Sequence, residues 1–325
     1  MRAAQVTSLA GPTAVEVVDV PEPSADGPFG PQVLVDVHAV GISFPDLLLT
    51  KGEYQLKPEL PFTLGVDFAG VVREAPAGSG HEPGDRVACV LPHGGAAEVV
   101  AVGPDSVFPL PGSLDFVQGA AMPMNYLTAQ FALADRADLR EGETVLVHGA
   151  AGGVGTASIQ VAKGYGARTI AVVSSEAKAA VARRAGADEV VLVDGFRDAV
   201  KELTGGGGVD VVVDVVGADL MTDSLRSLAP LGRLLVVGFT GGSIPEVRVN
   251  RLLLNNIDVR GVGWGAYAMS RPGFMRRQWE ELQPMMDTGV IDPPIGETAP
   301  LEEIGRALAD MDGRRTLGKT VLTLR

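Results

Sequence analysis

Short apolar runs alternate with helical patterns in the middle of the chain. Thr144–His148 and Thr169–Val173 are apolar runs of strand length, and each predicts a strand that is buried on both faces of a sheet. Between them, Ile159, Val161 and Ala162 supply the apolar face of a helix. A strand, a tight glycine turn, a helix and a second strand in this order form the βαβ unit of a dinucleotide-binding fold.

The turn between this strand and this helix is rich in glycine. Residues 150–155 read AAGGVG, which fits the G-x-G-x-x-G pattern with alanine in the first position. We expect Gly152 to let the backbone approach a pyrophosphate, and Gly155 to let the helix pack closely on the strand. Unpaired N–H groups at the helix start would then face the phosphates. The predicted contacts are Ala151, Gly152, Gly153 and Val154. A glycine-rich turn in an unrelated α/β sheet is the alternative interpretation.

The chain before residue 124 differs in pattern from the chain after it. The first part consists of strand-like runs separated by proline and glycine: Val15–Val18, Gln32–Val40, Phe68–Val72, Arg86–Val90 and Ala97–Val102. The second part alternates buried strands, at 209–214, 232–238 and 257–262, with helices at 126–134, 175–185, 197–203 and 218–228. In the tail we expect a helix at 273–282 that stops before Pro284, a helix at 301–311 and a strand at 319–324.

This order of elements predicts an α/β protein with two domains. A length of 325 residues is enough for two separate cores. We expect a β-rich substrate domain at 1–123 and 266–325, and a doubly wound parallel-sheet domain inserted at 124–265.

Composition excludes several kinds of partner. A net charge of −13 and a pI near 4.8 argue against binding to nucleic acid or to an anionic membrane. The N-terminal stretch lacks the apolar core of a signal peptide, and no uncharged apolar run reaches about 18 residues. Cys89 is the only cysteine, which fits a reducing cytoplasm and leaves no internal disulfide. With four scattered histidines beside it, we expect no metal site.

Several motifs together resemble the medium-chain dehydrogenase/reductase superfamily. They are the turn at 150–155, GVDFAG at 65–70, NRLLL at 250–254 and GVGWG at 261–265. Within the superfamily, the chain is most similar to the zinc-independent NADPH:quinone oxidoreductases of bacteria, from its first residue to its last. The resemblance implies a GroES-like substrate domain, an inserted Rossmann domain and a cleft between them.

The positions that hold catalytic zinc in alcohol dehydrogenases of this superfamily carry other residues here. The matching places are 41–43 (Gly-Ile-Ser) and 65–67 (Gly-Val-Asp), so Ser43 and Val66 stand where a cysteine and a histidine are needed. Without a Lewis acid, an alkoxide is harder to stabilise. Acceptors that delocalise the charge of an incoming hydride are therefore favoured, such as quinones or C=C bonds conjugated to a carbonyl.

The residues after the second strand of the βαβ unit favour NADPH over NADH. Ser174 and Ser175 offer hydroxyls, and Lys178 offers a charge, for a 2′-phosphate. The resemblance assigns this role to Lys178. Against it, Glu176 lies close to the spacing expected of an acid that binds the ribose hydroxyls, and Val193 stands where relatives often have a tyrosine. A solvated helix charge is the alternative interpretation of Lys178.

The resemblance also assigns residues to the nicotinamide end of the cofactor. Beyond the strand ends these are Gly238, Phe239, Thr240 and Trp264; at the start of the first helix of the inserted domain they are Asn125 and Thr128; and near the C-terminus it is Lys319. The alternative interpretation of Phe239 and Trp264 is that they are ordinary core aromatics. The alternative interpretation of Lys319 is a charge at the edge of a strand.

Three polar side chains in the first domain are the candidates for the acceptor site: Ser43, Asp46 and Tyr54. By resemblance they lie around the nicotinamide and the quinone. A Ser or Tyr hydroxyl could hydrogen-bond the developing oxyanion, whereas hydride transfer itself needs mainly alignment. Relatives often have asparagine at the position of Ser43. The alternative interpretation of Asp46 is a purely structural role, in which it accepts backbone N–H hydrogen bonds.

Three functions remain open from the sequence. The leading prediction is an NADPH-dependent quinone reductase. The alternatives are a reductase of activated C=C bonds in 2-alkenals or enoyl thioesters, for which Arg251, Arg276 and Arg277 could bind carrier phosphates, and a non-catalytic NADPH-binding sensor. By analogy, the strand at 257–263 predicts a homodimer.

Overall fold

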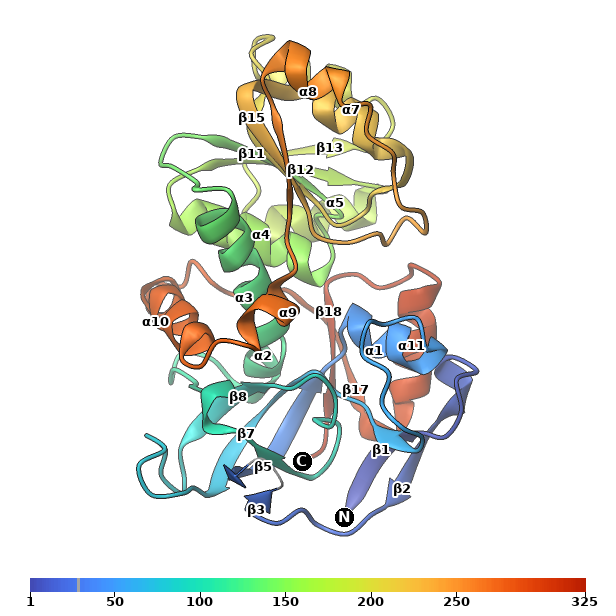
Figure 1. Ribbon diagram of the computed structural model, residues 1–325, viewed down its shortest axis with the longest axis vertical. Helices are drawn as coiled ribbons and strands as arrows, with labels where there is room; N and C mark the ends of the chain where they lie inside the picture. Colours follow the sequence, from blue (N-terminus) through green and yellow to red (C-terminus); the bar gives the residue numbers. More distant parts are fainter. Residues whose placement is uncertain (28–29) are drawn as a thin grey trace. The chain divides into compact units, whose positions relative to one another are not determined.

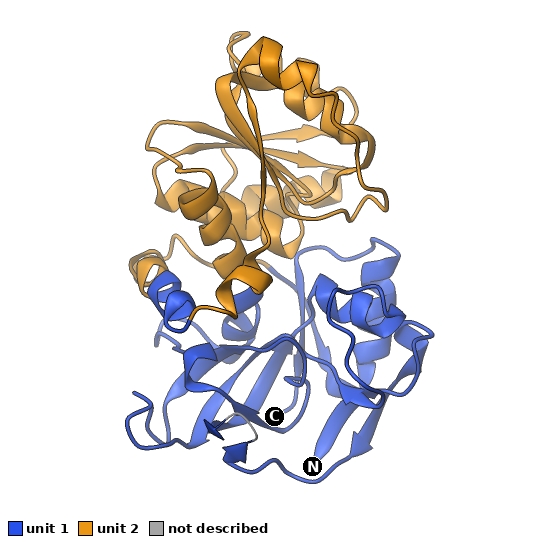
Figure 2. Ribbon diagram, viewed as in Figure 1, with its two compact units in different colours: residues 1–124, 272–279, 295–325 blue, residues 125–271, 280–294 orange. Residues whose placement is uncertain are grey.

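The structure, a computed structural model, describes residues 1–27 and 30–325. These residues divide into two compact units (Figure 2). Unit 1 contains residues 1–124, 272–279 and 295–325, and unit 2 contains residues 125–271 and 280–294. No helix in the described part of the chain is long and apolar enough to span a bilayer.

Unit 1 is built mainly from antiparallel strands. They are β1 (Arg2–Val6), β2 (Val15–Asp19), β3 (Asp26–Gly27), β4 (Gly30–Pro31), β5 (Val33–Gly41), β6 (Phe62–Thr63), β7 (Asp67–Glu74), β8 (Arg86–Val90), β9 (Val99–Val102), β10 (Val107–Pro109), β17 (Ile295–Pro300) and β18 (Lys319–Thr323). The helices are α1 (Phe44–Lys51), α2 (Phe116–Ala120) and α11 (Ile304–Asp312), with 3-10 turns η1 (Pro12–Ala14), η2 (Pro104–Ser106) and η5 (Leu301–Glu303).

The larger sheet of unit 1 joins the C-terminal strand to strands from the first 110 residues. Its strand order is β10-β8-β7-β5-β18-β17, and β9 also pairs with β5. The C-terminal strand β18 runs antiparallel to β5, with Val321 opposite Gly41. Apolar side chains such as Val37, Phe68 and Leu322 fill the core beneath this sheet. This pairing brings the start of β18 beside the end of β5.

Unit 2 is a doubly wound parallel sheet (Figure 1). Its strands are β11 (Thr144–His148), β12 (Arg168–Val173), β13 (Glu189–Leu192), β14 (Val209–Asp214), β15 (Leu228–Val236) and β16 (Asp258–Gly261), in the order β13-β12-β11-β14-β15-β16. Its helices are α3 (Pro123–Gln130), η3 (a π-helix, Phe131–Arg136), α4 (Gly153–Gly164), α5 (Glu176–Arg184), α6 (Phe196–Leu203), η4 (Ala218–Leu220), α7 (Met221–Arg226), α8 (Asn250–Asn255) and α9 (Trp264–Ala268).

Helices cover both faces of this sheet. On one face, α6 and α7 bury Phe196, Val200 and Leu225 against Leu146 of β11. On the other, α4 packs on β11 and β12 and contacts α5 and η3. Because successive side chains of a strand point to opposite faces, an apolar run such as Val145–Val147 serves both cores at once. The predicted parallel sheet is confirmed.

Helix α10 (Phe274–Asp287) corrects one sequence prediction. The expected stop before Pro284 is wrong, because the helix continues through this proline. Trp279, Leu282 and Met286 form one fully buried stripe at helical spacing, whereas Pro284 lies on the exposed side. Burial of the stripe outweighs the hydrogen bond that the proline cannot donate.

The two units divide the chain differently from the expected domain boundaries. Residues 266–271 and 280–294, which were expected in the substrate domain, belong to unit 2. The second half of α10 explains this assignment, because Glu281 accepts a hydrogen bond from Gln130 and Met285 lies against Gly164.

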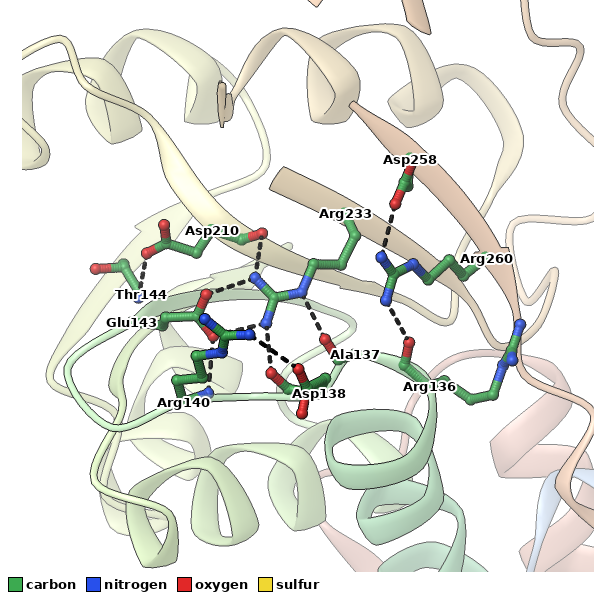
Figure 3. A network of polar contacts seen from close by, with 10 residues as sticks. All are labelled: Arg136, Ala137, Asp138, Arg140, Glu143, Thr144, Asp210, Arg233, Asp258 and Arg260. Carbon is green, nitrogen blue, oxygen red and sulfur yellow. Dashed lines mark hydrogen bonds and ion pairs between the residues drawn. The ribbon is translucent and has the colours of Figure 1, made fainter. Parts of the chain in front are cut away.

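A buried arginine ties together the segments at the amino ends of the strands in unit 2 (Figure 3). The guanidinium of Arg233 binds both carboxylate oxygens of Glu143, each at 2.6 Å. It also donates to the carbonyl oxygens of Ala137 (2.9 Å), Asp138 (3.2 Å) and Asp210 (3.3 Å). All the guanidinium nitrogens are therefore hydrogen-bonded, and β15 is fixed to the segments before β11 and in β14.

Candidate functional site

The glycine turn of unit 2 leads directly from β11 into α4. Gly152 is the N-cap of α4, and the N–H of Thr156 is bonded back to the carbonyl oxygen of Gly152 at 2.9 Å. The N–H groups of the first turn before Thr156 remain available for an anion. A Cβ on Gly155 would lie 2.2 Å from the carbonyl oxygen of Gly149, so only glycine permits this close approach of helix to strand. The predicted packing role of Gly155 is confirmed.

One of the predicted nicotinamide contacts, Asn125, lies beside this turn. Asn125 and Thr128 are one turn apart on α3, and both are buried. The side chain of Asn125 lies against the start of α4, because a Cβ on Gly153 would be 2.6 Å from Asn125 Oδ1. The structure thus brings Asn125 together with Gly153 of the predicted turn.

The three predicted 2′-phosphate residues form one group after β12. Ser175 is the N-cap of α5, and its hydroxyl accepts a hydrogen bond from the Lys178 N–H at 3.4 Å. The Lys178 ammonium donates to the Ser174 hydroxyl at 3.2 Å. Glu176 is exposed, and its carboxylate lies 3.8 Å from the guanidinium of Arg183. The group therefore presents one ammonium and two hydroxyls, with the neighbouring acid paired elsewhere.

The segment after β15 is fastened to the segment after β14. The N–H and hydroxyl of Thr240 both donate to the carbonyl oxygen of Val215, at 3.1 and 3.0 Å. Asp214 accepts the N–H groups of Val216 and Gly217, each at 2.8 Å, and so fixes this segment. These loops follow the carboxyl ends of their strands, where ligands of doubly wound sheets bind.

The two aromatic candidates of unit 2 differ in their surroundings. Phe239, which follows Gly238, is 38% exposed and lies over Gly217, so it is not a core aromatic. Trp264 is buried at the start of α9. The structure therefore leaves Phe239 accessible to a ligand and encloses Trp264.

A buried polar cluster occupies the region of unit 1 where β5, β7 and β18 meet. Its members, which we call the Lys319 cluster, are Ser43, Asp46, Asp67 and Lys319. The Lys319 ammonium donates to Ser43 Oγ at 2.7 Å and to Asp67 Oδ2 at 3.0 Å, and Ser43 Oγ donates to the same Asp67 oxygen at 2.7 Å. The only hydroxyl hydrogen of Ser43 is thus committed to Asp67.

Backbone groups complete this cluster. Asp67 Oδ1 accepts the N–H of Met124 at 2.7 Å. Asp46 Oδ2 accepts the N–H of Ser43 at 2.9 Å, and Asp46 Oδ1 accepts the N–H of Gly65 at 3.0 Å. Asp46 therefore caps α1 and joins it to the segment before β7.

Gly41 makes room for the side chain of Lys319. A Cβ on Gly41 would lie 2.0 Å from the carbonyl oxygen of Ala120 and 2.9 Å from Lys319 Cε. Because Gly41 ends β5 opposite Val321, its missing side chain gives the lysine its path into the cluster. The structure thus places Lys319 in unit 1 together with Ser43 and Asp46.

Burial dominates the electrostatics of Asp46. The pKa of this carboxyl is raised to about 7, chiefly by complete burial and to a smaller extent by the Asp67 charge. The N–H donors of Ser43 and Gly65 and the charge of Lys319 oppose the rise by stabilising the carboxylate.

Tyr54 lies near this cluster but is not hydrogen-bonded into it. The ring is partly buried against the core of unit 1. Burial raises the pKa of its phenol, and the negative charge of Asp46 adds to the rise. The phenol therefore keeps its proton at neutral pH and is able to donate a hydrogen bond.

Asp67 is the member of the Lys319 cluster that sequence reasoning missed. It stands between Val66 and Phe68, directly before the apolar run 68–72 of β7. An acid at a buried strand position requires a cation or several donors close by, and this signal could have identified it. Its partner Lys319 lies 252 residues away in the sequence.

These features define a class of protein. A doubly wound sheet with a glycine turn and a β-rich unit with a buried polar cluster are the parts of a nicotinamide-dependent oxidoreductase of the medium-chain type.

Comparisons with known proteins place the chain within this class. The model for the alcohol dehydrogenase GroES-like domain matches residues 30–112, and that for zinc-binding dehydrogenases matches residues 153–287. The chain is 40% identical to quinone oxidoreductase-like protein 2 of Rattus norvegicus, over 100% of this chain and 92% of the relative.

Solved structures agree with this assignment. A probable oxidoreductase from Mycobacterium abscessus is 47% identical, with a TM-score of 0.90 over 100% of this chain and 99% of the other. The quinone oxidoreductase of Thermus thermophilus, also solved with NADPH, is 33% identical, with a TM-score of 0.83 over 100% of both chains. The chain belongs to the quinone oxidoreductase family of the medium-chain dehydrogenase/reductase superfamily, and the predicted family and GroES-like and Rossmann fold class are confirmed.

The residues of the Lys319 cluster do not fit a zinc ion, although one matching family model is named for zinc. Zinc in proteins prefers thiolate, imidazole and carboxylate ligands. Ser43 and the apolar Val66 replace two of these, and each oxygen of Asp67 and Asp46 already accepts a hydrogen bond. Within the described residues, no three His, Cys, Asp or Glu side chains are arranged to hold a metal.

Proposed function

We propose that the protein transfers a hydride from NADPH to quinones without a metal ion. The observation that carries this proposal is the Lys319 cluster, in which an ammonium and a serine hydroxyl stand in the place of a zinc site. A quinone spreads the charge of the added hydride over its conjugated ring, so it has less need of a Lewis acid. Hydride addition and one proton from water convert the quinone to a hydroquinone.

The cofactor side of the proposal rests on unit 2. NADPH supplies the hydride, and two of the chain's solved relatives were determined as complexes with NADPH. The N–H groups at the start of α4 would bind the pyrophosphate. The ammonium of Lys178 and the hydroxyls of Ser174 and Ser175 would bind the 2′-phosphate. Phe239, Thr240 and Asn125 would orient the nicotinamide half.

Two of the three arginines considered for carrier phosphates, Arg276 and Arg277, support quinones over enoyl thioesters. Arg276 donates to the carbonyl oxygen of Pro104 at 3.4 Å. The guanidinium of Arg277 lies 4.9 Å from the ring centre of Phe274. Both side chains are thus engaged within unit 1.

Steady-state oxidation of NADPH with 1,4-benzoquinone, crotonaldehyde and crotonyl-CoA tests the proposal. We expect the highest kcat/KM with benzoquinone. A higher value with crotonaldehyde or crotonyl-CoA would assign the protein to the reduction of activated C=C bonds. Tight NADPH binding without turnover of any acceptor would support a sensor instead.

We also propose that the protein forms a homodimer through the free edge of β16. This strand ends the sheet of unit 2, and Leu253 and Leu254 of the preceding α8 are 77% and 74% exposed. Light scattering after size exclusion should give the mass of two chains. A Leu253→Asp variant should shift the protein to one chain, and a monomeric wild type would contradict the proposal.

A further inference from the structure

The Lys319 ammonium has one more hydrogen than its partners use. An ammonium donates three hydrogen bonds. In the described part of the chain, two acceptors are found for it: Ser43 Oγ at 2.7 Å and Asp67 Oδ2 at 3.0 Å. The third N–H is left for a ligand. Lys319 is 6% exposed, whereas Asp46 and Asp67 are 0% exposed, so a ligand can reach the lysine more readily than the two acids.

This ammonium is also a positive charge that acts on both buried acids. It contacts Asp67 directly and partly offsets the charge of Asp46. A divalent metal at Asp67 Oδ2 would have to displace the charge-assisted hydrogen bonds that Lys319 and Ser43 both donate to this oxygen. The cluster therefore already contains its cation.

We propose that the Lys319 ammonium is the built-in cation of the acceptor site: it closes the cluster to metal ions, and its third N–H binds the carbonyl oxygen of the acceptor. The proposal deepens the proposed function and rests on it. When the hydride adds to the quinone ring, negative charge develops on this oxygen. A preorganised N–H donor in a buried site stabilises that charge. Lys319 keeps its proton throughout, and water protonates the hydroquinone oxygen.

Ser43 and Asp67 act in this arrangement as positioning residues for the ammonium. Two fixed acceptors hold Nζ, and the path beside Gly41 holds the stem of the side chain. The direction of the third N–H is thus fixed before a ligand arrives. Lys319 was expected from the resemblance to contact the cofactor, so cofactor binding is the competing assignment that the experiment must separate.

The variant Lys319→Met removes the ammonium and keeps most of the side-chain volume. The matched control is Lys51→Met, because Lys51 forms an ion pair of 2.7 Å with Asp312 at the surface of the same unit. For each protein we would measure the zinc content after dialysis, the Kd of NADPH, and kcat and KM for 1,4-benzoquinone.

We expect dialysed wild type to contain far less than one zinc per chain. Lys319→Met should lower kcat with benzoquinone on the order of 100-fold, as the loss of an oxyanion donor does, and leave the Kd of NADPH unchanged. Lys51→Met should match wild type. One zinc per wild-type chain, an unchanged kcat, or a weaker Kd for NADPH with unchanged kcat would each overturn the proposal.

A second variant covers the case in which Lys319→Met does not fold because Asp67 is left unpaired. The double variant Lys319→Met/Asp67→Asn removes both charges, so it should fold and show the same loss of kcat. Wild-type-like turnover in the double variant would refute the role of the ammonium. If wild type itself oxidises NADPH with none of the acceptors, the proposed function fails first, and the zinc content still tests the closed cluster.

Discussion

The arginine clamp of unit 2 yields a prediction whose size follows from the structure. The change is Arg233→Met, which keeps an unbranched side chain and removes the guanidinium. It breaks the ion pair with Glu143 and leaves the carbonyl oxygens of Ala137, Asp138 and Asp210 without this donor (Figure 3).

Burial sets the magnitude of this loss. The Arg233 side chain is 8% exposed and that of Glu143 is 21% exposed. Removing one partner of a buried ion pair costs about 3–5 kcal/mol of unfolding free energy. Because water partly reaches Glu143, which also accepts the N–H of Arg140, we expect the lower end, about 3 kcal/mol.

Urea unfolding followed by circular dichroism measures the change, with hydrogen exchange of β11, β14 and β15 to locate it in unit 2. Arg140→Met is the control, because Arg140 pairs with Asp138 at 3.2 Å while both side chains are more than three-quarters exposed, at 77% and 79%. The control should cost less than about 1 kcal/mol. Adding Glu143→Gln to Arg233→Met should recover part of the loss, since no buried charge remains unpaired.

A loss for Arg233→Met no larger than that of the control would refute this reasoning. It would mean that water or a neighbouring group replaces the guanidinium at little cost. Faster hydrogen exchange spread evenly over both units would also contradict it, because the clamp joins only segments of unit 2.

Four further predictions follow from the candidate sites. Lys178→Ala should raise KM for NADPH at least about tenfold and KM for NADH little, since only NADPH has the 2′-phosphate; equal effects would remove its role. Tyr54→Phe should lower kcat with benzoquinone about fivefold, because the hydrogen bond from the phenol to the developing oxyanion is lost; an unchanged kcat would show that this hydrogen bond does not contribute. Asp46 has a pKa of about 7 in the folded state, above its unfolded value of about 3.9, so the folded state binds more protons between these pH values. Unfolding free energy should therefore fall as pH rises from about 4 to 7 and level off above, and Asp46→Asn should flatten this slope in urea titrations. Gly155→Ala should cost about 1–3 kcal/mol in the same assay, because the new Cβ meets the Gly149 carbonyl oxygen; a smaller loss would mean that α4 can shift away from β11.

The parts of the fold that could be predicted are those with local signals. The runs at 144–148 and 209–214 are apolar over a whole strand length, and the glycine turn has a fixed spacing, so the parallel sheet could be read directly. The continuation of α10 through Pro284 could not be predicted. The local sequence shows the hydrogen bond that the proline cannot donate, but it does not show that the apolar stripe of α10 is buried. The change from α3 to a π-helix at Phe131 could not be predicted either, because no local sequence pattern indicates it.

The candidate site was predictable to different degrees in the two units. Ser174, Ser175 and Lys178 are close in sequence, and the structure brings them together through the N-terminus of α5. Asp67 and Lys319 are joined only because β18 returns beside β5 from the far end of the chain. The sequence therefore pointed to Lys319 but not to its buried acidic partner, and the cofactor contact assigned to Lys319 by resemblance stays a prediction.

The arrangement of the Lys319 cluster bears on the proposal that a lysine takes the role that a metal ion has in alcohol dehydrogenases. A zinc ion polarises an oxygen strongly, and its two charges need several anionic or imidazole ligands. A single ammonium requires only one acid beside it, which Asp67 supplies, and Asp46 is then free to bind the N–H groups of Ser43 and Gly65. The weaker field of the ammonium suits an acceptor that carries most of the new charge in its own conjugated system. Under the proposed function, the chemistry of the cluster and the choice of acceptor are two consequences of the same residues, and a change that introduced a metal should also widen the range of carbonyl groups that the protein reduces.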